Sequence, residues 1–164
     1  MQVRRLERRD IPEACVLLNR IIALGGTTAH EMPFDDAGLA AYLMGPETLC
    51  CHVVLDDAGR VAGFQHLEPH AGLPEGCGDI ATFTRRDDPV KGAGRALMAA
   101  TVARARALGL REINATIRAD NGPGLGYYRG MGFVERSATR GVPLADGRPV
   151  DRLHHRLALG ETSG

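Results

Sequence analysis

The most informative stretch of this sequence is a glycine-rich segment, Arg85-Arg-Asp-Asp-Pro-Val-Lys-Gly-Ala-Gly-Arg-Ala-Leu97, which joins an apolar strand-like run to a long alanine-rich run typical of a helix. The first backbone N–H groups of a helix are unpaired, and with the helix dipole they favour an anion. Gly92 and Gly94 let the backbone approach such a group closely. Lys91 and Arg95 add positive charge. The segment therefore indicates a phosphate or pyrophosphate site.

Two common phosphate motifs do not match this segment. A P-loop reads G-x-x-x-x-G-K-[ST], and no such run occurs here. A dinucleotide-binding fingerprint needs a third glycine where Leu97 stands. Taken alone, the Gly-x-Gly turn is as compatible with an ordinary strand-to-helix connection as with a ligand site.

A second informative segment follows one strand further on. It reads Asn121-Gly-Pro-Gly-Leu-Gly-Tyr-Tyr-Arg-Gly-Met-Gly-Phe133. Together the two segments resemble the acetyl-coenzyme A binding core of the GCN5-related N-acetyltransferases, the GNAT family. That family's first motif is Q/R-x-x-G-x-G/A after the fourth strand. Its second motif has Asn, a small residue three positions on, Tyr seven on and Gly-Phe at eleven and twelve, which matches Asn121, Gly124, Tyr128, Gly132 and Phe133.

The order of apolar runs and turns agrees with the fold that the resemblance implies. The order is β-α-α-β-β-β-α-β-α-β-β, with hairpins early and helices between strands later. The resemblance implies an α/β GNAT fold, with a mixed, mostly antiparallel sheet of six to seven strands and about four helices. One domain is expected over residues 1–159, with a flexible tail over 160–164. Asp10 and Glu13 are expected to form a capping box at the first helix.

The first motif departs from the family pattern at one position. The family's Q/R falls on Pro89, which lacks a backbone N–H. The expectation is that one contact to the pyrophosphate is missing or that the loop is reshaped, and that coenzyme binding is weaker. The expected coenzyme contacts that remain in this turn are Lys91, Gly92, Ala93, Gly94 and Arg95.

The implied reaction is direct transfer of the acetyl group of acetyl-CoA to a primary amine. The resemblance assigns the thioester oxygen to backbone donors near Phe83 and Thr84, and the acid that protonates the leaving thiolate to Tyr128. Tyr127 is expected to be a core residue. Asn121, with Gly124 beside it, is expected to bind the pantetheine arm or to hold the turn.

The base that accepts the amine's proton is less clearly marked. Asp79 falls where some phosphinothricin-type members of the family carry a glutamate, and it shares a strand face with Ala81 and Phe83. Glu31, Glu68 and His66 are its rivals, and water can relay the proton instead. A solvated carboxylate at the start of the strand is the alternative interpretation of Asp79.

The acceptor is expected to bind beside the loop Leu24-Gly-Gly-Thr-Thr-Ala-His-Glu31, which joins the first two helices. In the family this region forms one wall of the acceptor site. Thr27, Thr28 and Glu31 are candidates to hold an ammonium or a carboxylate, and a plain glycine-rich loop is the alternative. A small, amino-acid-like amine is the expected acceptor. A protein N-terminus or lysine remains open, as does a non-catalytic acetyl-CoA sensor.

Composition and charge argue against several other classes of protein. Glycine supplies 21 of 164 residues, nearly twice the usual share, and basic and acidic residues balance at 20 each. That balance, with 4% aromatics and no Trp, argues against a nucleic-acid binder. No apolar run approaches a membrane span, and the charged start does not resemble a signal peptide. The four cysteines form no C-x-x-C pair, and His154 and His155 have no metal-ligand partner at useful spacing. We expect a cytoplasmic protein without a metal that can form a homodimer.

Overall fold

The computed structural model describes residues 1–160, so the expected tail lies outside the described residues except for Gly160. The strands are β1 (Gln2–Arg5), β2 (Cys50–Leu55), β3 (Val61–Glu68), β4 (Cys77–Thr84), β5 (Glu112–Arg118), β6 (Val134–Pro143) and β7 (Pro149–Ala158). The α-helices are α1 (Ile11–Leu24), α2 (Asp36–Met44), α3 (Ala93–Ala107) and α4 (Gly122–Gly130). A short 3-10 helix, Arg8–Asp10, precedes α1. The expected element order is confirmed.

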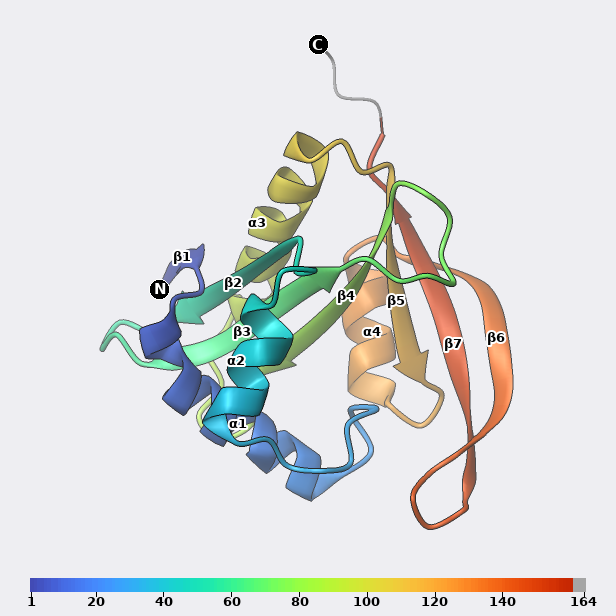
Figure 1. The fold of residues 1–164 in the computed structure, drawn as a ribbon, viewed down its shortest axis with the longest axis horizontal. Helices are drawn as coiled ribbons and strands as arrows, with labels where there is room; N and C mark the ends of the chain where they lie inside the picture. The colour runs from blue at the N-terminus through green and yellow to red at the C-terminus, as the bar shows by residue number, and fades with distance from the viewer. Residues whose placement is uncertain (161–164) are drawn as a thin grey trace.

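The strands form one seven-stranded sheet in the order β1-β2-β3-β4-β5-β7-β6 (Figure 1). Every neighbouring pair is antiparallel except β4 and β5, which are parallel because α3 crosses over between them. The sheet is therefore mixed and mostly antiparallel, as expected. The last strand, β7, lies between β5 and β6.

β4 and β5 pair along only a short part of their length. Their register covers Cys77–Asp79 against Glu112–Asn114. Beyond Asp79 the two strands diverge, and Figure 1 shows the open wedge between them. This separation positions the site described below, because it leaves backbone groups of both strands without a sheet neighbour.

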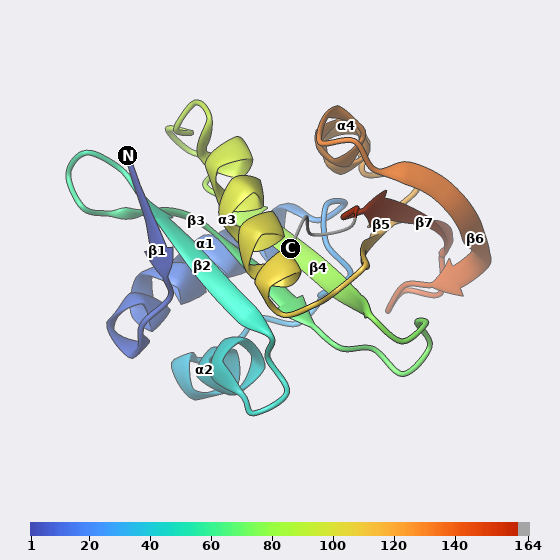
Figure 2. The ribbon, with the colours of Figure 1, turned by 90° about the horizontal axis from the view of Figure 1, so that it is seen from above.

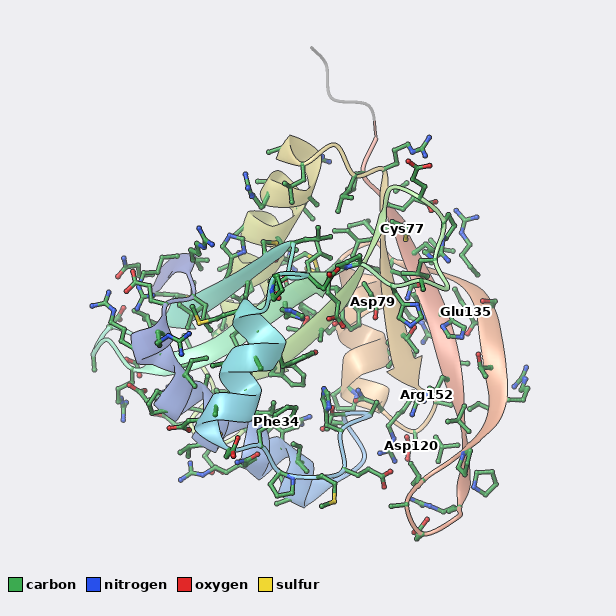
Figure 3. All side chains as sticks on the ribbon, viewed as in Figure 1. Phe34, Cys77, Asp79, Asp120, Glu135 and Arg152 are labelled. Atoms are coloured by element: carbon green, nitrogen blue, oxygen red, sulfur yellow. The ribbon has the colours of Figure 1, made fainter. Side chains whose placement is uncertain are left out.

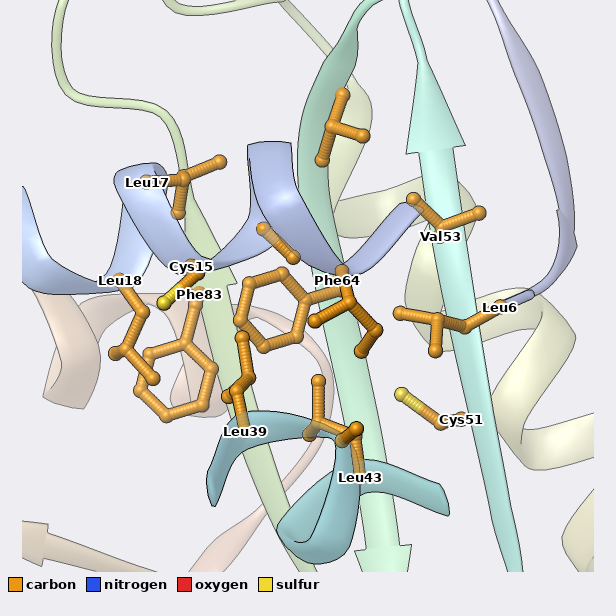
Figure 4. Close-up of a cluster of buried hydrophobic side chains, with 14 of the residues drawn as sticks. Leu6, Cys15, Leu17, Leu18, Leu39, Leu43, Cys51, Val53, Phe64 and Phe83 are labelled. Atoms are coloured by element: carbon orange, nitrogen blue, oxygen red, sulfur yellow. The ribbon is translucent and has the colours of Figure 1, made fainter. Parts of the chain in front are cut away.

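The helices cover both faces of the sheet (Figure 2). α1 and α2 pack on one face of β2–β4, where Leu18, Leu39, Phe64 and Phe83 belong to one buried cluster (Figure 4). α3 lies on the opposite face, against β2 and β3. Cys50 and Cys51 accordingly join different clusters, as their alternation along the strand predicts.

Short sequence patterns predict most helix ends correctly, with one exception. Asp35 caps α2 by accepting from the Gly38 N–H at 2.7 Å. The expected capping box of Asp10 and Glu13 is wrong. Asp10 instead accepts from the Arg4 guanidinium and from the Glu7 N–H, since it belongs to the 3-10 turn before α1. Glu13 accepts from the Val61 N–H at the start of β3, 2.9 Å away.

Candidate active site

A cavity of about 1250 Å³ opens where β4 and β5 separate. Its walls come from the ends of β4 and β5, the first turn of α3, α4, the α1–α2 loop and β7. Figure 3 labels Asp79 on β4 and Arg152 on β7, which both line it. Segments far apart in the sequence therefore meet around one space, and both glycine motifs contribute to it.

The backbone of β4 alternates between its two neighbours. The Arg85 N–H donates to the Ala62 carbonyl at 2.8 Å, so every second residue of β4 pairs with β3 in this antiparallel ladder. By that alternation Phe83 directs its N–H toward β3. Thr82 and Thr84 direct theirs into the wedge. Of the two expected donor positions, Thr84 is oriented toward the cavity and Phe83 is not, while Thr82 was missed because the register was unknown.

The first glycine motif forms the turn into α3. Gly92 caps the helix with φ +84°, a left-handed conformation that favours glycine. Gly94 is small for a different reason, because a Cβ there would lie 2.8 Å from the Tyr127 ring. Gly92, Ala93, Gly94 and Arg95 line the cavity together with Pro89. Lys91 is exposed and does not line it.

The two tyrosines of the second motif lie side by side. Tyr128 is 7% exposed, with its ring against Phe133, and its hydroxyl is 2.8 Å from Thr82 Oγ1. Burial raises the pKa of Tyr128 above its ordinary value, so the hydroxyl stays protonated. The Tyr127 hydroxyl donates to the Gly94 carbonyl at 2.7 Å. Tyr127 packs in the core, as expected, and it also lines the cavity.

Asn121 organises the start of α4. Its Oδ1 accepts from the Gly124 N–H at 3.0 Å, and its Nδ2 donates to the Thr27 carbonyl at 3.2 Å. A Cβ on Gly124 would lie 2.3 Å from Asn121 Nδ2, which explains the small residue at this motif position. Both ends of the amide are thus used inside the protein, so the structure supports the turn-holding role of Asn121.

Asp79 lies where the β4–β5 pairing stops. It accepts from Asn114 Nδ2 at 2.9 Å, and burial raises the pKa of its carboxyl. Glu68 is its register partner on β3, also lines the cavity and has a pKa raised by burial. His66, a rival base, is fully buried beside Thr48, does not line the cavity, and burial lowers its pKa to about 4. Asp79 and Glu68 are therefore the carboxylates available to a bound amine.

The expected acceptor residues separate into two groups. Thr28 is buried and lines the cavity, where its Oγ1 accepts from the His30 N–H at 3.1 Å. Glu31 does not line the cavity. Its carboxylate accepts from the Ala145 N–H, in the turn between β6 and β7, at 2.9 Å. Glu31 therefore ties the α1–α2 loop to that turn, and its role at the acceptor site stays a prediction.

Three side chains of β7 that the sequence reasoning missed also line the cavity, namely Arg152, His154 and Arg156. They occupy alternate positions of one strand, so they share a face. Arg156 donates to Asn114 Oδ1 at 2.8 Å and pairs with Glu112. Arg152 forms no side-chain hydrogen bond or ion pair within residues 1–160. The period-two alternation was visible in the sequence, but not the two strands between which β7 lies.

The family is shown by comparison with known proteins. A family model described as "Acetyltransferase (GNAT) family" matches residues 18–133. The chain belongs to this family. The acetyltransferase is also 31% identical over 160 residues to an L-methionine sulfoximine/L-methionine sulfone acetyltransferase of Pseudomonas aeruginosa. That alignment covers 93% of this chain and 91% of the relative.

Solved structures show the same fold. A phosphinothricin acetyltransferase from Sinorhizobium meliloti, in complex with acetyl-CoA, matches with a TM-score of 0.86 and 22% identity, over 99% of this chain and 90% of that one. A ribosomal-protein-alanine N-acetyltransferase from Brucella melitensis matches with a TM-score of 0.86 and 20% identity, over 96% and 99%. At these identities the likeness establishes the fold.

The chain is therefore an N-acetyltransferase, with acetyl-CoA as its co-substrate. The site fits that molecule. Unpaired backbone groups of β4 face the wedge, and the glycine turn supplies a helix N-terminus. Within residues 1–160 no group of His, Cys, Asp and Glu side chains is arranged to hold a metal ion. In the same range no helix has the length and apolar character to cross a membrane.

Proposed function

We propose that this acetyltransferase acetylates the amine of a small, amino-acid-like acceptor by direct attack on acetyl-CoA. The observation that supports the acceptor class is the placement of opposite charges in one cavity. Asp79 and Glu68 come from one side of the wedge, and Arg152 comes from the other. A free amino acid carries an ammonium and a carboxylate, so it matches both. The name of the Pseudomonas relative agrees with this class.

Arg152 is the proposed ligand for the acceptor's carboxylate. Arg118 already binds Asp120 through two contacts of 2.8 and 2.9 Å, and Arg156 pairs with Glu112. Arg152 keeps its guanidinium free within the described residues, and a guanidinium matches a carboxylate in two-point geometry. The acceptor is thus held at the end opposite its amine.

Different residues of the protein carry out the separate steps of the acetyl transfer. Acetyl-CoA, when bound, supplies the acetyl group as a thioester. The Thr82 and Thr84 N–H groups orient the thioester oxygen and donate to it as it gains charge. Asp79, directly or through water, takes the proton from the attacking amine. Tyr128 gives its proton to the departing sulfur. The coenzyme's pyrophosphate binds at the turn of Gly92–Gly94, with Arg95 beside it.

An acceptor panel tests this proposal. Thiol release from acetyl-CoA is measured with L-amino acids, L-methionine sulfoximine and sulfone, polyamines, aminoglycosides and peptides. We expect the highest kcat/KM for a free amino acid. The matching amine without its carboxylate should be at least about tenfold poorer, and Arg152→Met should remove that difference. Preference for a peptide would favour protein acetylation. Coenzyme binding without turnover on any acceptor would favour a sensor.

We further propose that residues 1–159 form one cytoplasmic domain that pairs as a homodimer. Four free cysteines, three of them buried, agree with a reducing compartment. β6 forms one edge of the sheet, and most of its residues are exposed, so it offers backbone groups for pairing with a second copy. Light scattering in solution gives the oligomeric state, and a monomer at working concentration would remove the dimer from the proposal.

A further inference from the structure

A chain of hydrogen bonds runs from the turn of α3 to the hydroxyl of Tyr128. The Tyr127 hydroxyl donates to the Gly94 carbonyl at 2.7 Å. Gln65 Nε2 is 3.1 Å from the Tyr127 oxygen and 2.9 Å from Thr82 Oγ1. Thr82 Oγ1 is 2.8 Å from the Tyr128 oxygen. Gln65 on β3 and Thr82 on β4 are direct register partners, which brings their side chains together.

The Gly94 carbonyl fixes the direction of the hydrogen bonds that Tyr127 and Gln65 make. The Gly94 carbonyl can only accept, so it takes the single proton of Tyr127. Gln65 must then donate to Tyr127, which fixes its NH₂ group toward the two hydroxyls. Its second N–H donates to Thr82 Oγ1, and in the bond between Thr82 and Tyr128 either oxygen can then be the donor. When Thr82 is the donor, the Tyr128 oxygen accepts, and the Tyr128 proton has no acceptor among the described residues.

We propose that Thr82 is the donor in its bond with Tyr128, so that Gln65 and Thr82 are positioning residues that hold the Tyr128 proton toward the cavity for transfer to the leaving sulfur. This inference deepens the proposed function and rests on it. Gln65 is fully buried, and its Oε1 has no partner within the described residues. A buried polar side chain with an unpaired oxygen is unfavourable in the core of a sheet. The hydrogen bonds of Gln65 to Tyr127 and Thr82 explain why a glutamine is present there.

The step balances with these groups. The amine nitrogen forms a bond to the acetyl carbon and releases a proton to Asp79 or water. The C–S bond breaks, and its electron pair passes to sulfur. Tyr128 transfers its proton to that sulfur, and Thr82 donates to the phenolate oxygen that remains. A hydrogen bond to the charged form favours it, so Thr82 lowers the pKa of Tyr128 against the effect of burial.

Substitutions of Thr82, which lies in the middle of this series of hydrogen bonds, test the proposal. Thr82→Val keeps the shape and the backbone donor but removes the hydroxyl, and Thr82→Ser restores the hydroxyl. We expect Thr82→Val to lower kcat about tenfold or more with the KM for acetyl-CoA changed less than about twofold, and Thr82→Ser to recover most of the rate. The matched control is Thr101→Val on α3, which removes a buried hydroxyl that has no hydrogen-bond partner among residues 1–160 and should leave kcat unchanged.

A second readout does not depend on turnover. The thiolate absorbance of bound CoA gives the pKa of its thiol, which a directed Tyr128 proton should lower from an ordinary value of about 8.5. Tyr128→Phe and Thr82→Val should both raise that pKa toward the ordinary value, whereas Thr82→Ser and Thr101→Val should not. Gln65→Met removes both N–H donors and should raise the thiol pKa as Thr82→Val does. Agreement between the two variants would show that the change does not come from a folding defect in one of them.

The outcomes separate the two proposals. If wild-type protein lowers the thiol pKa but acetylates no amine, the proposed function fails while the hydrogen-bond chain stands. If Tyr128→Phe loses rate but Thr82→Val and Gln65→Met match wild type in kcat and in thiol pKa, the positioning role is overturned. Melting temperatures of all variants show which of them are folded.

Discussion

At the scale of single residues, the half-buried carboxylate of Asp79 costs stability but suits the reaction. It is the last residue of β4 to pair with β5, and its only side-chain hydrogen bond in the described chain comes from Asn114. Burial disfavours its charged form and raises its pKa. A raised pKa makes the carboxylate a better proton acceptor for an amine near neutral pH.

Asp79→Asn should therefore stabilise the protein and slow the reaction. Because the folded-state pKa is raised above the unfolded value, the stabilising effect of protonation is present below the unfolded pKa of about 3.9 and is lost as the pH rises through the folded pKa. The variant should melt at a higher temperature than wild type at pH 7, and the difference should vanish below about pH 4. Melting curves from pH 3 to 8 check this.

The pH dependence of kcat/KM tests whether Asp79 is the base. The kcat/KM of wild type should fall as the pH drops through the raised pKa, and Asp79→Asn should remove that dependence while lowering kcat. If the acidic limb persists in Asp79→Asn, the group responsible is another one. Glu68, which lies opposite on β3, is then the candidate to substitute next.

At the scale of elements, α4 is a short helix held by its ends. Asn121 caps its start, and Tyr127 fastens it to Gly94 on α3. Its interior is weak, because Gly126 costs about 1 kcal/mol relative to alanine. Nothing lies within 4 Å of a Cβ built on Gly126, whereas one on Gly94 would lie 2.8 Å from the Tyr127 ring. The two glycines therefore have opposite roles.

Alanine at these two positions should have opposite effects. Gly126→Ala should raise the free energy of unfolding by about 1 kcal/mol and leave coenzyme affinity unchanged. Gly94→Ala should displace Tyr127, lower the melting temperature and weaken CoA binding, since the turn and the tyrosine move together. Thermal melts and CoA titrations by calorimetry measure both. Equal behaviour of the two variants would show that the Gly94–Tyr127 contact is unimportant.

These elements also show what the sequence reveals and what it hides. Motif spacing predicts the turn, the cap and Tyr128, because each depends on residues within a few positions of one another. The orientation of Thr82 and Phe83 depends on the register between β3 and β4, which spacing along one strand does not determine. Asp10 and Glu13 mislead for a similar reason, since their partners Arg4 and Val61 lie on other elements.

At the scale of the whole molecule, the sheet consists of two parts joined at a narrow seam. Three register pairs connect β4 to β5, and beyond them the cavity takes the place of sheet pairing. The fold follows from the two motifs and the element order. The acceptor side does not, because β7 reaches the cavity only by inserting between β5 and β6. Arg152 is therefore invisible as a site residue until the strand order is known.

Acetyl-CoA should act as the missing strand of this seam. Hydrogen exchange of the Thr82 and Thr84 amides, which face the wedge, should be fast in the free protein and slow with acetyl-CoA bound. The Phe83 amide, which pairs with β3, is the internal control and should stay slow throughout. At a coenzyme concentration 100 times Kd, stability should rise by about 2.7 kcal/mol. Uniform protection of all three amides without ligand would contradict the proposed orientation of β4.

The strand order has a consequence for how the enzyme is made. Chains are synthesised from the N-terminus, and earlier parts fold first. β1 to β4 can form a complete antiparallel unit while translation continues, but β6 has no sheet neighbour until β7 follows it. Of the described strands, the last to leave the ribosome is thus an interior one, and it brings Arg152. A nascent chain stalled at Pro143 would carry both glycine motifs, yet its acceptor side would remain unbuilt until translation resumed.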